Sequence, residues 1–589
     1  MNKKNGVLLM NVKRPDALQN DGAVDCLGLF YLAAALENKG YEPWVFHGLT
    51  SDVPDILEKY VKEYKIAAVG FSCDYKNKSA VTELCLYVKE KYEVTVIIGG
   101  PQAAALDGKF LSESRCDYIV RGEAEETLPE LLDFIVHSKG VPEQIKGLCW
   151  LNKSNEFIIN DARDPVSELD ALPFPAYHRS LRKDRRYGGT IFTGRGCPFA
   201  CAFCYQSNHK KKVRLRSIAN VTQEIKNNLE NNDGLKYITV MDDTFTLNSQ
   251  RVSEFCSAIN ILRKDRNIGW YCEGHVRTLA RQPEMLKSMA ESGLLRLQIG
   301  VETGCAKVLE AYGKNTTLDE IEFVVREAVR CKVPQIATNF IVGGPFECGE
   351  VIDETISFAE KLLNIAPGII DIATGFLRPY PGTAISNNPA AFGLKISEHD
   401  ELKSFDDYPP VSVNGLCAED VINNRVKVSW HISKTMLKIL KDNKVPYETI
   451  LSQYKIAAEY GVTSMWYLNV FKRNQLLNEY FRLICQGSAR RLTDVPAGEL
   501  TSWRPQRTVE IWRIVDIRKG YPQIDDYVLS PLEFELLLHC SGKMTLNEVI
   551  TSLHEKFGSR FESENEFLEE IKQLLKNFDA RYWVVFCKL

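Results

Sequence analysis

The sequence lacks the features that mark membrane, secreted and nucleic-acid-binding proteins. None of its 589 residues belong to an apolar run of about 18, so we expect no membrane-spanning helix. The apolar stretch behind the basic start, Val7–Val12, is too short for a signal peptide and no small-residue cleavage site follows it. A net charge of −4 gives no reason to expect nucleic acid or an anionic membrane as a partner. We therefore expect a cytoplasmic protein.

Several common sequence patterns are also missing. The chain has no internal repeat, no low-complexity tract and no GxGxxG motif, so a dinucleotide site is not expected. Its 17 cysteines are odd in number and scattered, which argues against a disulfide framework. What is present is an ordinary globular composition, 45% apolar and 25% charged, in a chain long enough for two to four domains.

Residues 1–150 alternate short apolar runs with helical patterns. The runs predict strands at residues 6–12, 42–46, 66–72, 94–101 and 116–122. This alternation predicts an α/β fold with a doubly wound parallel sheet, which binds ligands at the carboxyl ends of its strands. The residues at the predicted ends are Ser72, Cys73, Asp74, Gly99, Gly100, Gly122 and Glu123. The glycines let a ligand approach the backbone, and the alternative for each of them is that it only turns the chain.

Four further regions follow. Residues 151–185 contain three prolines within 164–178 and predict a linker. Residues 186–396 hold six strand–helix units, two short of a closed barrel, and predict a partial (βα)6 barrel. Residues 397–505 are mainly helical, and residues 506–589 predict a small α+β domain of winged-helix type.

One group of cysteines is tightly spaced. Cys197, Cys201 and Cys204 form a CxxxCxxC motif where the first strand of the predicted barrel ends. Thiolates are the usual ligands of iron–sulfur clusters, and three on one loop leave the fourth iron of a [4Fe–4S] cluster open for a substrate. Two alternatives remain: a structural zinc site completed by His209, or three unrelated buried thiols.

This motif, with Phe203 before the third cysteine, resembles the radical S-adenosylmethionine (SAM) superfamily over roughly residues 186–390. The resemblance implies that the three cysteines hold a [4Fe–4S] cluster, whose open iron binds the methionine end of SAM. One electron then cleaves SAM to a 5′-deoxyadenosyl radical. Later strand ends resemble the SAM-contacting motifs of the family. The residues concerned are Asp242, Asp243, Glu302, Gly343 and Gly344.

The N-terminal region resembles the cobalamin-binding class of radical SAM enzymes. The segments that carry this resemblance are residues 27–42, 69–77, 97–103 and 118–131, followed by residues 170–177. The DxHxxG motif of other cobalamin domains is absent, which leaves the lower face of the cobalt unassigned. A vestigial or regulatory domain is the alternative.

Together the two resemblances imply a methyltransferase that acts on an unactivated carbon. They imply that cobalamin takes a methyl group from one SAM and that a second SAM supplies the radical that removes a substrate hydrogen. A radical cyclase or oxidoreductase with the same cofactors is the main alternative, and a cobalamin-responsive regulator is a remote one. The candidates to face the substrate, which lie near predicted strand ends, are Tyr205, His209, Glu273 and Arg378.

The last region, residues 507–589, resembles the PqqD-like domains that hold leader peptides of ribosomally made natural products. Such domains add a peptide strand to an exposed sheet edge. A purely structural cap is the alternative. We therefore expect a peptide or a small-molecule natural-product precursor as substrate, and a reductant such as flavodoxin or ferredoxin as electron donor.

Overall fold

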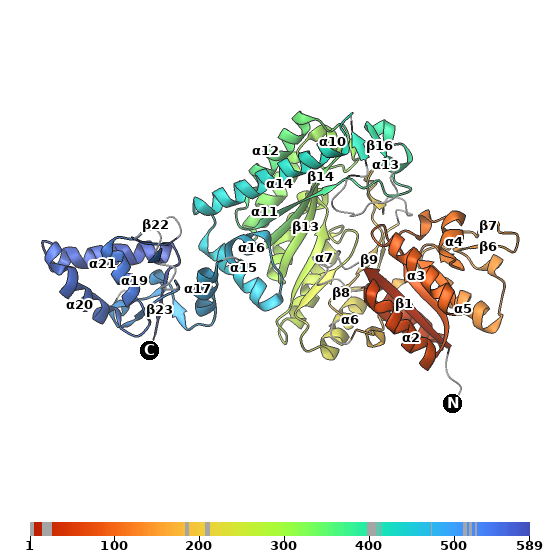
Figure 1. Cartoon of the computed structure of the whole chain (residues 1–589), viewed down its shortest axis with the longest axis horizontal. Helices are drawn as coiled ribbons and strands as arrows, with labels where there is room; N and C mark the ends of the chain where they lie inside the picture. Colours follow the sequence, from red (N-terminus) through yellow and green to blue (C-terminus); the bar gives the residue numbers. More distant parts are fainter. Residues whose placement is uncertain are drawn as a thin grey trace. The chain divides into compact units, whose positions relative to one another are not determined.

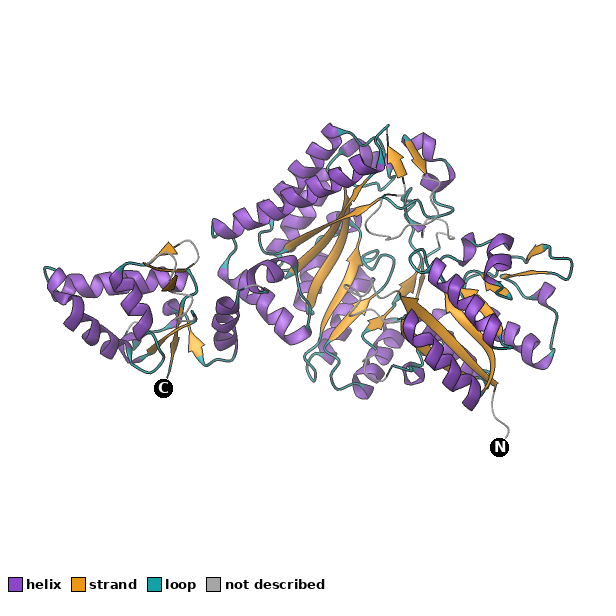
Figure 2. Cartoon of the chain, in the orientation of Figure 1, coloured by secondary structure: helices purple, strands orange, loops and turns teal. Residues whose placement is uncertain are grey.

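The computed structural model describes residues 5–13, 26–182, 188–205, 212–396, 409, 411–413, 415–472, 474–496, 498–509, 515–516, 521–524 and 527–588. The chain divides into two compact units, Met1–Thr435 and Met436–Leu589. The first unit contains two large sheets with helices on their faces, and the second is a small α+β domain preceded by helices (Figures 1 and 2).

The N-terminal sheet has seven strands in the order β2-β1-β3-β4-β5-β6-β7. The first five are parallel and the last two are antiparallel. The strands are β1 (Asn5–Lys13), β2 (Glu42–Leu49), β3 (Lys65–Ser72), β4 (Thr95–Gly99), β5 (Tyr118–Val120), β6 (Leu148–Leu151) and β7 (Phe157–Ile159). The helices between them are α1 (Leu27–Asn38), α2 (Val53–Glu63), α3 (Lys78–Lys91), α4 (Gly108–Ser114) and α5 (Thr127–His137).

Both faces of this sheet are buried, as expected for parallel strands connected by helices. Val7 and Leu9 of β1 pack into one apolar cluster, and Leu8 and Met10 pack into the cluster on the opposite face. The predicted doubly wound fold is therefore confirmed. The sheet continues beyond residue 150, because β7 comes from the segment predicted to be a linker.

The second sheet is the partial barrel. Its six parallel strands lie in the order β15-β14-β13-β12-β11-β8. They are β8 (Thr190–Ile191), β11 (Tyr237–Val240), β12 (Gly269–Gly274), β13 (Leu294–Glu302), β14 (Gln335–Val342) and β15 (Ile370–Phe376). The helices are α6 (Ile218–Asn231), α7 (Ser249–Leu262), α8 (Val276–Arg281), α9 (Glu284–Glu291), α10 (Ala306–Ala311), α11 (Leu318–Arg330) and α12 (Gly349–Ile365).

Side chains alternate between the two faces of the barrel wall. In β13, Leu297, Ile299 and Val301 are fully buried, whereas Arg296 and Gln298 between them are half-buried. The apolar face packs against the helices, so the polar face lines the inside of the barrel. The interior is thus equipped for polar ligands.

Short elements complete the first unit. A two-stranded antiparallel hairpin, β9 (Gly194–Arg195) with β10 (Arg214–Leu215), follows β8. After the barrel come α13 (Ala384–Asn387), β16 (Leu394–Ile396), β17 (Val411–Val413) and the long helix α14 (Ala418–Lys441). The pairing of β17 with β16 means that the region predicted to be mainly helical, residues 397–505, also contains a strand.

The second unit contains three helices, α15 (Tyr447–Tyr460), α16 (Met465–Phe471) and α17 (Gln475–Cys485), before its C-terminal domain. That domain has two three-stranded sheets, β18-β23-β19 and β20-β21-β22. The strands are β18 (Ala489–Arg490), β19 (Arg504–Arg507), β20 (Val515–Asp516), β21 (Tyr521–Ile524), β22 (Tyr527–Val528) and β23 (Val584–Cys587). The helices are α19 (Pro531–His539), α20 (Leu546–Phe557) and α21 (Glu564–Ala580).

Local sequence explains where the C-terminal helices begin. Ser530 with Glu533, and Thr545 with Glu548, form capping boxes at the starts of α19 and α20. The sequence of residues 507–517 also predicts a strand, but much of it lies outside the described residues, apart from the start of that segment and β20. Among the helices of the described residues, none is both long and apolar enough to cross a bilayer.

Candidate functional site

The three closely spaced cysteines lie on a loop that the β9–β10 hairpin closes. Gly196, with φ +94°, opens this loop, and a Cβ there would lie 2.8 Å from the Lys212 carbonyl oxygen. The loop is tied to the barrel at Ala202, whose N–H donates to the Tyr312 carbonyl (2.8 Å) and whose carbonyl accepts from the N–H of Ile385 (3.1 Å). Its ends and its middle are therefore fixed by backbone contacts.

The thiols themselves are close enough to interact. Burial raises the pKa of Cys201 to about 11; the Lys314 ammonium opposes this, and Cys204, Glu302 and Cys197 add to it. All three cysteines are partly exposed. They form a set of thiols at one opening of the barrel, with a cation nearby.

This set fits an iron–sulfur cluster better than a single ion. Within the described ranges, no three Cys, His, Asp or Glu side chains lie close enough to share one metal ion. In a [4Fe–4S] cubane each thiolate binds a different iron, so three thiolates surround the cluster instead of converging on a point. His209, the ligand that the zinc alternative requires, lies outside the described residues.

Asp242 and Asp243 follow β11 and contact the start of the cysteine loop. Asp242 accepts hydrogen bonds from the N–H and hydroxyl of Thr193 (both 2.5 Å) and from the N–H of Gly194 (3.1 Å). Burial raises the pKa of Asp242 to about 6, and these hydrogen bonds limit the rise. Asp243 accepts from the N–H of Gly196 at 2.9 Å and is half-buried. Both carboxylates therefore hold the start of the cysteine loop, and Asp242 makes more of these contacts.

Glu302 ends β13 in a strained conformation. Its φ is +65°, and the β13–β14 register shifts between Gly300 and Glu302. The buried carboxylate forms an ion pair with Lys314, which is also buried. A Cβ at Gly300 would collide with both charged groups, so the pair needs glycine there. Backbone strain of this kind is concentrated at functional sites.

Gly343 and Gly344 follow β14 and form a turn. Gly343 has φ +80°, and both N–H groups donate to the Glu347 carboxylate, at 2.6 and 3.4 Å. Asn424 of α14 donates to the other carboxylate oxygen at 2.9 Å. The predicted SAM residues of this turn are thus shaped by Glu347, which the sequence analysis did not single out.

His275 is a second residue that the sequence analysis missed. It follows β12, its ring stacks on Phe199 of the cysteine loop (centroids 3.6 Å apart, 11°), and its Nδ1 accepts from the N–H of Arg277. Burial lowers the pKa of His275 to about 4, so the ring is neutral at pH 7 and Nε2 carries its proton. Nε2 is buried without a hydrogen-bond partner among the described atoms.

The residues predicted to face the substrate lie in different settings. Glu273 points into the barrel, where it accepts from the Tyr271 hydroxyl and the Gln298 amide, each at 3.2 Å. Burial raises its pKa, and the charges of Asp243 and Glu302 contribute further. Tyr205 directly follows the last loop cysteine, with its ring centroid 6.5 Å from that of Tyr380.

Tyr380 connects the barrel to the N-terminal sheet. Its ring makes an edge contact with Tyr75, which follows β3, at 5.4 Å between centroids. Arg378, two residues before it, is buried, and its charge acts on the Tyr380 hydroxyl. The aromatic group Tyr75, Tyr380 and Tyr205 therefore links the ligand edge of the N-terminal sheet to the cysteine loop.

That ligand edge has a backbone cradle. Gly122, with φ +79°, has no atom within 4 Å of the position of a Cβ, and at Gly99 the nearest would be 3.9 Å away. Gly100, with φ +94°, approaches the β3 end so closely that a Cβ would lie 2.8 Å from the Ser72 hydroxyl. An edge with few side chains in the way fits a large macrocycle such as cobalamin.

Three other residues predicted for this edge are engaged elsewhere. The Cys73 side chain is fully buried, and burial raises its pKa to about 12. The Asp74 carboxylate accepts from the N–H groups of Lys76 and Asn77, at 2.8 and 2.9 Å, and turns the chain into α3. Glu123 is bound by arginines of the barrel. The backbone of Cys73 is engaged as well, because its N–H donates to the Gly99 carbonyl at 2.8 Å and its carbonyl accepts from the N–H of Gln102 at 3.0 Å.

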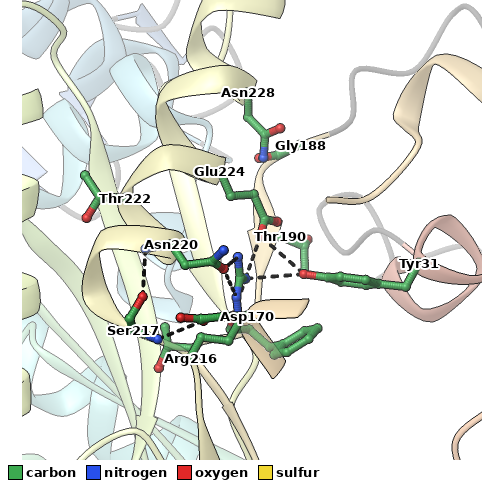
Figure 3. A network of polar contacts seen from close by, with 12 residues as sticks. Tyr31, Asp170, Gly188, Thr190, Arg216, Ser217, Asn220, Thr222, Glu224 and Asn228 are labelled. Atoms are coloured by element: carbon green, nitrogen blue, oxygen red, sulfur yellow. Dashed lines mark hydrogen bonds and ion pairs between the residues drawn. The ribbon is translucent and has the colours of Figure 1, made fainter. Parts of the chain in front are cut away.

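The two sheets of the first unit also meet through a polar network (Figure 3). Arg216, which follows β10, forms a buried 2.5 Å ion pair with Glu224 of α6. Tyr31 of α1 points at this pair, donates to Glu224 at 3.2 Å and accepts from Arg216 at 3.3 Å. The N–H of Ser217 donates to Asp170 at 2.9 Å. Buried charges paired in this way fix one arrangement of the groups around them.

Two protein-family models match separate parts of the chain. The Radical SAM superfamily model matches residues 191–359, and the B12 binding domain model matches residues 21–132. In fold, the chain is similar to the cobalamin-dependent S-adenosylmethionine radical enzyme OxsB, whose structure contains aqua-cobalamin and S-adenosylmethionine. The TM-score is 0.59 with 14% identity, over 98% of this chain and 84% of OxsB.

Two curated relatives bear on the activity. Anaerobic magnesium-protoporphyrin IX monomethyl ester cyclase of Cereibacter sphaeroides is 27% identical over 351 residues, which cover 56% of this chain and 55% of the cyclase. The uncharacterized methyltransferase PH0819 of Pyrococcus horikoshii is 31% identical over 379 residues, which cover 62% of this chain and 79% of the relative. Because this relative is 31% identical and 79% of its length is covered, and both family models match, the chain belongs to the cobalamin-dependent radical SAM methyltransferase family, whose cofactors are a [4Fe–4S] cluster, SAM and cobalamin.

Proposed function

We propose that this enzyme methylates an unactivated carbon of a peptide or of another natural-product precursor. When bound, the cluster and SAM supply a 5′-deoxyadenosyl radical that removes a substrate hydrogen atom, and the cobalamin supplies the methyl group that takes its place. The observation that carries the proposal is direct contact between the two cofactor regions. Glu123, next to the Gly122 cradle, binds Arg195, two residues before Cys197, at 3.4 Å.

In this proposal the chain's own residues bind and orient. Cys197, Cys201 and Cys204 hold the cluster, and Asp243 and Glu302 lie at the strand ends where SAM would be bound. Asp242 fixes the loop through Thr193 and Gly194, and its contact with SAM stays a prediction. Lys314 lies near Cys201, and its ammonium opposes the rise in the pKa of this thiol that burial causes.

The barrel interior supplies the substrate contacts. Tyr271, Glu273 and Gln298 share a hydrogen-bonded network on its inner face. Asn339 of β14 is exposed one strand further on, and its register partner Ala373 leaves space beside it. Carboxamide and carboxyl groups arranged in this way suit a substrate with amide, amine or hydroxyl groups. Among the predicted catalytic residues, Glu273 is the best placed to bind such a group.

The test is anaerobic turnover with SAM that carries a trideuterated methyl group. The purified enzyme, loaded with cobalamin and cluster, is incubated with a metabolite and peptide extract from cells that lack its gene. Mass spectrometry should find a product in which one trideuteromethyl group replaces a hydrogen. The similarity to the cyclase favours radical cyclisation or oxidation as the second candidate. That activity would give 5′-deoxyadenosine with an unlabelled product.

The C-terminal domain would hold the leader of a peptide substrate. Of the two edges of the β18-β23-β19 sheet, β19 is already covered: Gln506 bridges to Ser541, and the N–H of Arg507 donates to the Cys540 carbonyl at 2.7 Å. An added peptide strand would therefore use β18. Hydrogen exchange of the Ala489 and Arg490 amides should slow when a precursor with its leader is added. A leaderless precursor serves as the control, and equal protection by both would argue against leader binding.

The electron donor is the remaining partner. Cleavage of SAM in this family consumes one electron, and we propose that a low-potential carrier such as flavodoxin or ferredoxin supplies it. Formation of 5′-deoxyadenosine with reduced flavodoxin as the sole reductant would support this. If only a chemical reductant such as titanium(III) citrate supported the reaction, a different carrier would be required.

A further inference from the structure

The β9–β10 hairpin forms a stem below the cysteine loop, and each of its two strands contains an arginine. The β9–β10 hairpin pairs Arg195 with Arg214, and all three cysteines lie in the loop that it closes. Each strand of the hairpin is only two residues long. So short a ladder fixes the loop weakly by itself, and side-chain contacts must supply the rest.

Both stem arginines bind one carboxylate of the N-terminal sheet. Arg214 grips Glu123 with two nitrogens, Nη1 to Oε2 at 2.9 Å and Nη2 to Oε1 at 2.6 Å. Arg195 lies 3.4 Å from the same carboxylate and donates to Glu125 at 2.7 Å. The N–H of Val166, in the segment between the two sheets, also donates to Glu123, at 2.8 Å.

Glu123 stands directly beside the open cradle. It follows Gly122, whose left-handed backbone leaves free space at the carboxyl end of β5. Burial would raise the pKa of the Glu123 carboxyl, but the hydrogen bonds from Arg214 and the charge of Arg195 outweigh burial and hold the pKa below its ordinary value. The carboxylate is therefore charged at neutral pH, and the two-pronged contact with Arg214 has a fixed direction.

A second contact with the N-terminal region is made just after β10. Arg216 follows β10 and engages Tyr31 of the N-terminal sheet's first helix as well as Glu224 (Figure 3). Thus three arginines at positions 195, 214 and 216 attach the stem to groups on the N-terminal side. The stem is the one place in the described residues where the cysteine loop and the cobalamin cradle share side-chain ion pairs.

We propose that Glu123, Arg195 and Arg214 are positioning residues that hold the cysteine loop in register with the cobalamin cradle. This rests on the proposed function, because the positioning matters only if both cofactors serve one reaction. Glu123 is then not a cobalamin ligand, although it lies beside the cradle. A shift of about 1 Å between reacting groups can cost about 100-fold in rate, so a small slip of the stem would separate radical formation from methyl transfer.

The test is Glu123→Gln in the holoenzyme. The amide keeps the size of the side chain but lacks the charge that both arginines bind. The ratio of 5′-deoxyadenosine formed to trideuteromethylated product should rise at least about tenfold. Cobalamin content, from the visible spectrum, and iron content should stay at the wild-type level. Arg214→Lys keeps the positive charge but cannot bind Glu123 through two nitrogens, so it should give a smaller rise in this ratio.

A spectroscopic measurement tests the register without a substrate. In protein that contains both cob(II)alamin and the reduced cluster, the cluster speeds the electron spin relaxation of cob(II)alamin to a degree set by their separation. Glu123→Gln should change and broaden this effect. The matched control is Glu37→Gln, which removes a carboxylate bound by Arg179 at 2.5 Å and by His178 at 3.0 Å, away from the stem.

The outcomes separate the two proposals. If Glu123→Gln leaves both the product ratio and the spin relaxation as in the wild type, the positioning role is wrong. If Glu123→Gln loses cobalamin while Arg214→Lys behaves as wild type, Glu123 is a cofactor ligand and the proposal also fails. If the wild type forms no labelled product, the proposed function fails, while the spin relaxation still decides on the stem.

Discussion

Two groups of three cysteines in this chain show what separates a cofactor site from a core. The group on the loop after β9 is partly exposed, whereas Cys73, Cys85 and Cys116 are buried in one apolar cluster of the N-terminal sheet. Burial raises the pKa of Cys73 and Cys116 to about 12, hardly more than the value of about 11 for Cys201. Proximity and the pKa of Cys201 therefore do not distinguish the loop group from the core group. Access does, because a cluster and its substrate need an open side.

The largest expected effect comes from the loop. Cys201→Ser should abolish cluster binding, since only two thiols of the motif remain, and with it all formation of 5′-deoxyadenosine. Iron and sulfide analysis and the low-temperature spectrum of the reduced protein measure the cluster. Retention of the wild-type iron content would show that the loop is not the cluster site.

The next largest effect is expected for Lys314, the cation beside the cysteine loop. Lys314→Met leaves the buried Glu302 carboxylate without its partner, and breaking such a pair costs about 3–5 kcal/mol. We expect a lower unfolding temperature and weaker SAM binding by calorimetry. Lys307→Met, which removes a lysine that only overlies the Phe346 ring at 4.6 Å, is the control. Equal behaviour of the two variants would contradict a special role for Lys314.

A smaller effect concerns the acid that fixes the loop. Burial raises the pKa of Asp242 from 3.8 to about 6, so the folded state binds this proton more tightly than the unfolded state. The stability gained by protonation is complete below pH 3.8 and is lost as the pH rises through 6. It amounts to about 1 kcal/mol between pH 5 and pH 7. Asp242→Asn should flatten this part of the stability profile of the cluster-free protein. An unchanged profile would contradict the assignment.

The smallest effect is expected in the core group. Cys85→Ala removes one buried sulfur from a packed cluster, at a cost of about 1 kcal/mol in stability. Iron content, SAM cleavage and methyl transfer should stay at wild-type levels. If Cys85→Ala lost iron, the core cysteines would also bind metal, and the contrast between the core group and the loop group would be wrong.

The sequence predicts the strands well where they are apolar. The five parallel strands of the first sheet and the six of the barrel follow from short buried runs that alternate with helices. β7 escaped prediction because Phe157–Ile159 is only partly buried and lacks the pattern of a core strand. Its place in the sheet depends on pairing with β6, a tertiary contact.

The site is predictable in its chemistry but not in its contacts. The CxxxCxxC spacing is local and points to the cluster by itself. Glu123, by contrast, meets Arg214 across 91 residues of sequence, and no local pattern indicates that pair. His275 has a faint signal, a histidine just after a strand, but its stacking on Phe199 again depends on the fold. The sequence therefore indicates which chemical groups are present, whereas the contacts that each group makes depend on the fold.

The arginine stem changes where this protein can be cut and recombined. A graft that exchanges residues 1–150 for those of a relative would keep the linker intact, yet it would place a foreign side chain opposite Arg195 and Arg214. The unit of exchange is set by these ion pairs and includes both the end of β5 and the hairpin around the cysteines. A chimera should keep its activity when Glu123, Arg195 and Arg214 all come from the same parent protein, even if the rest of the N-terminal domain is replaced.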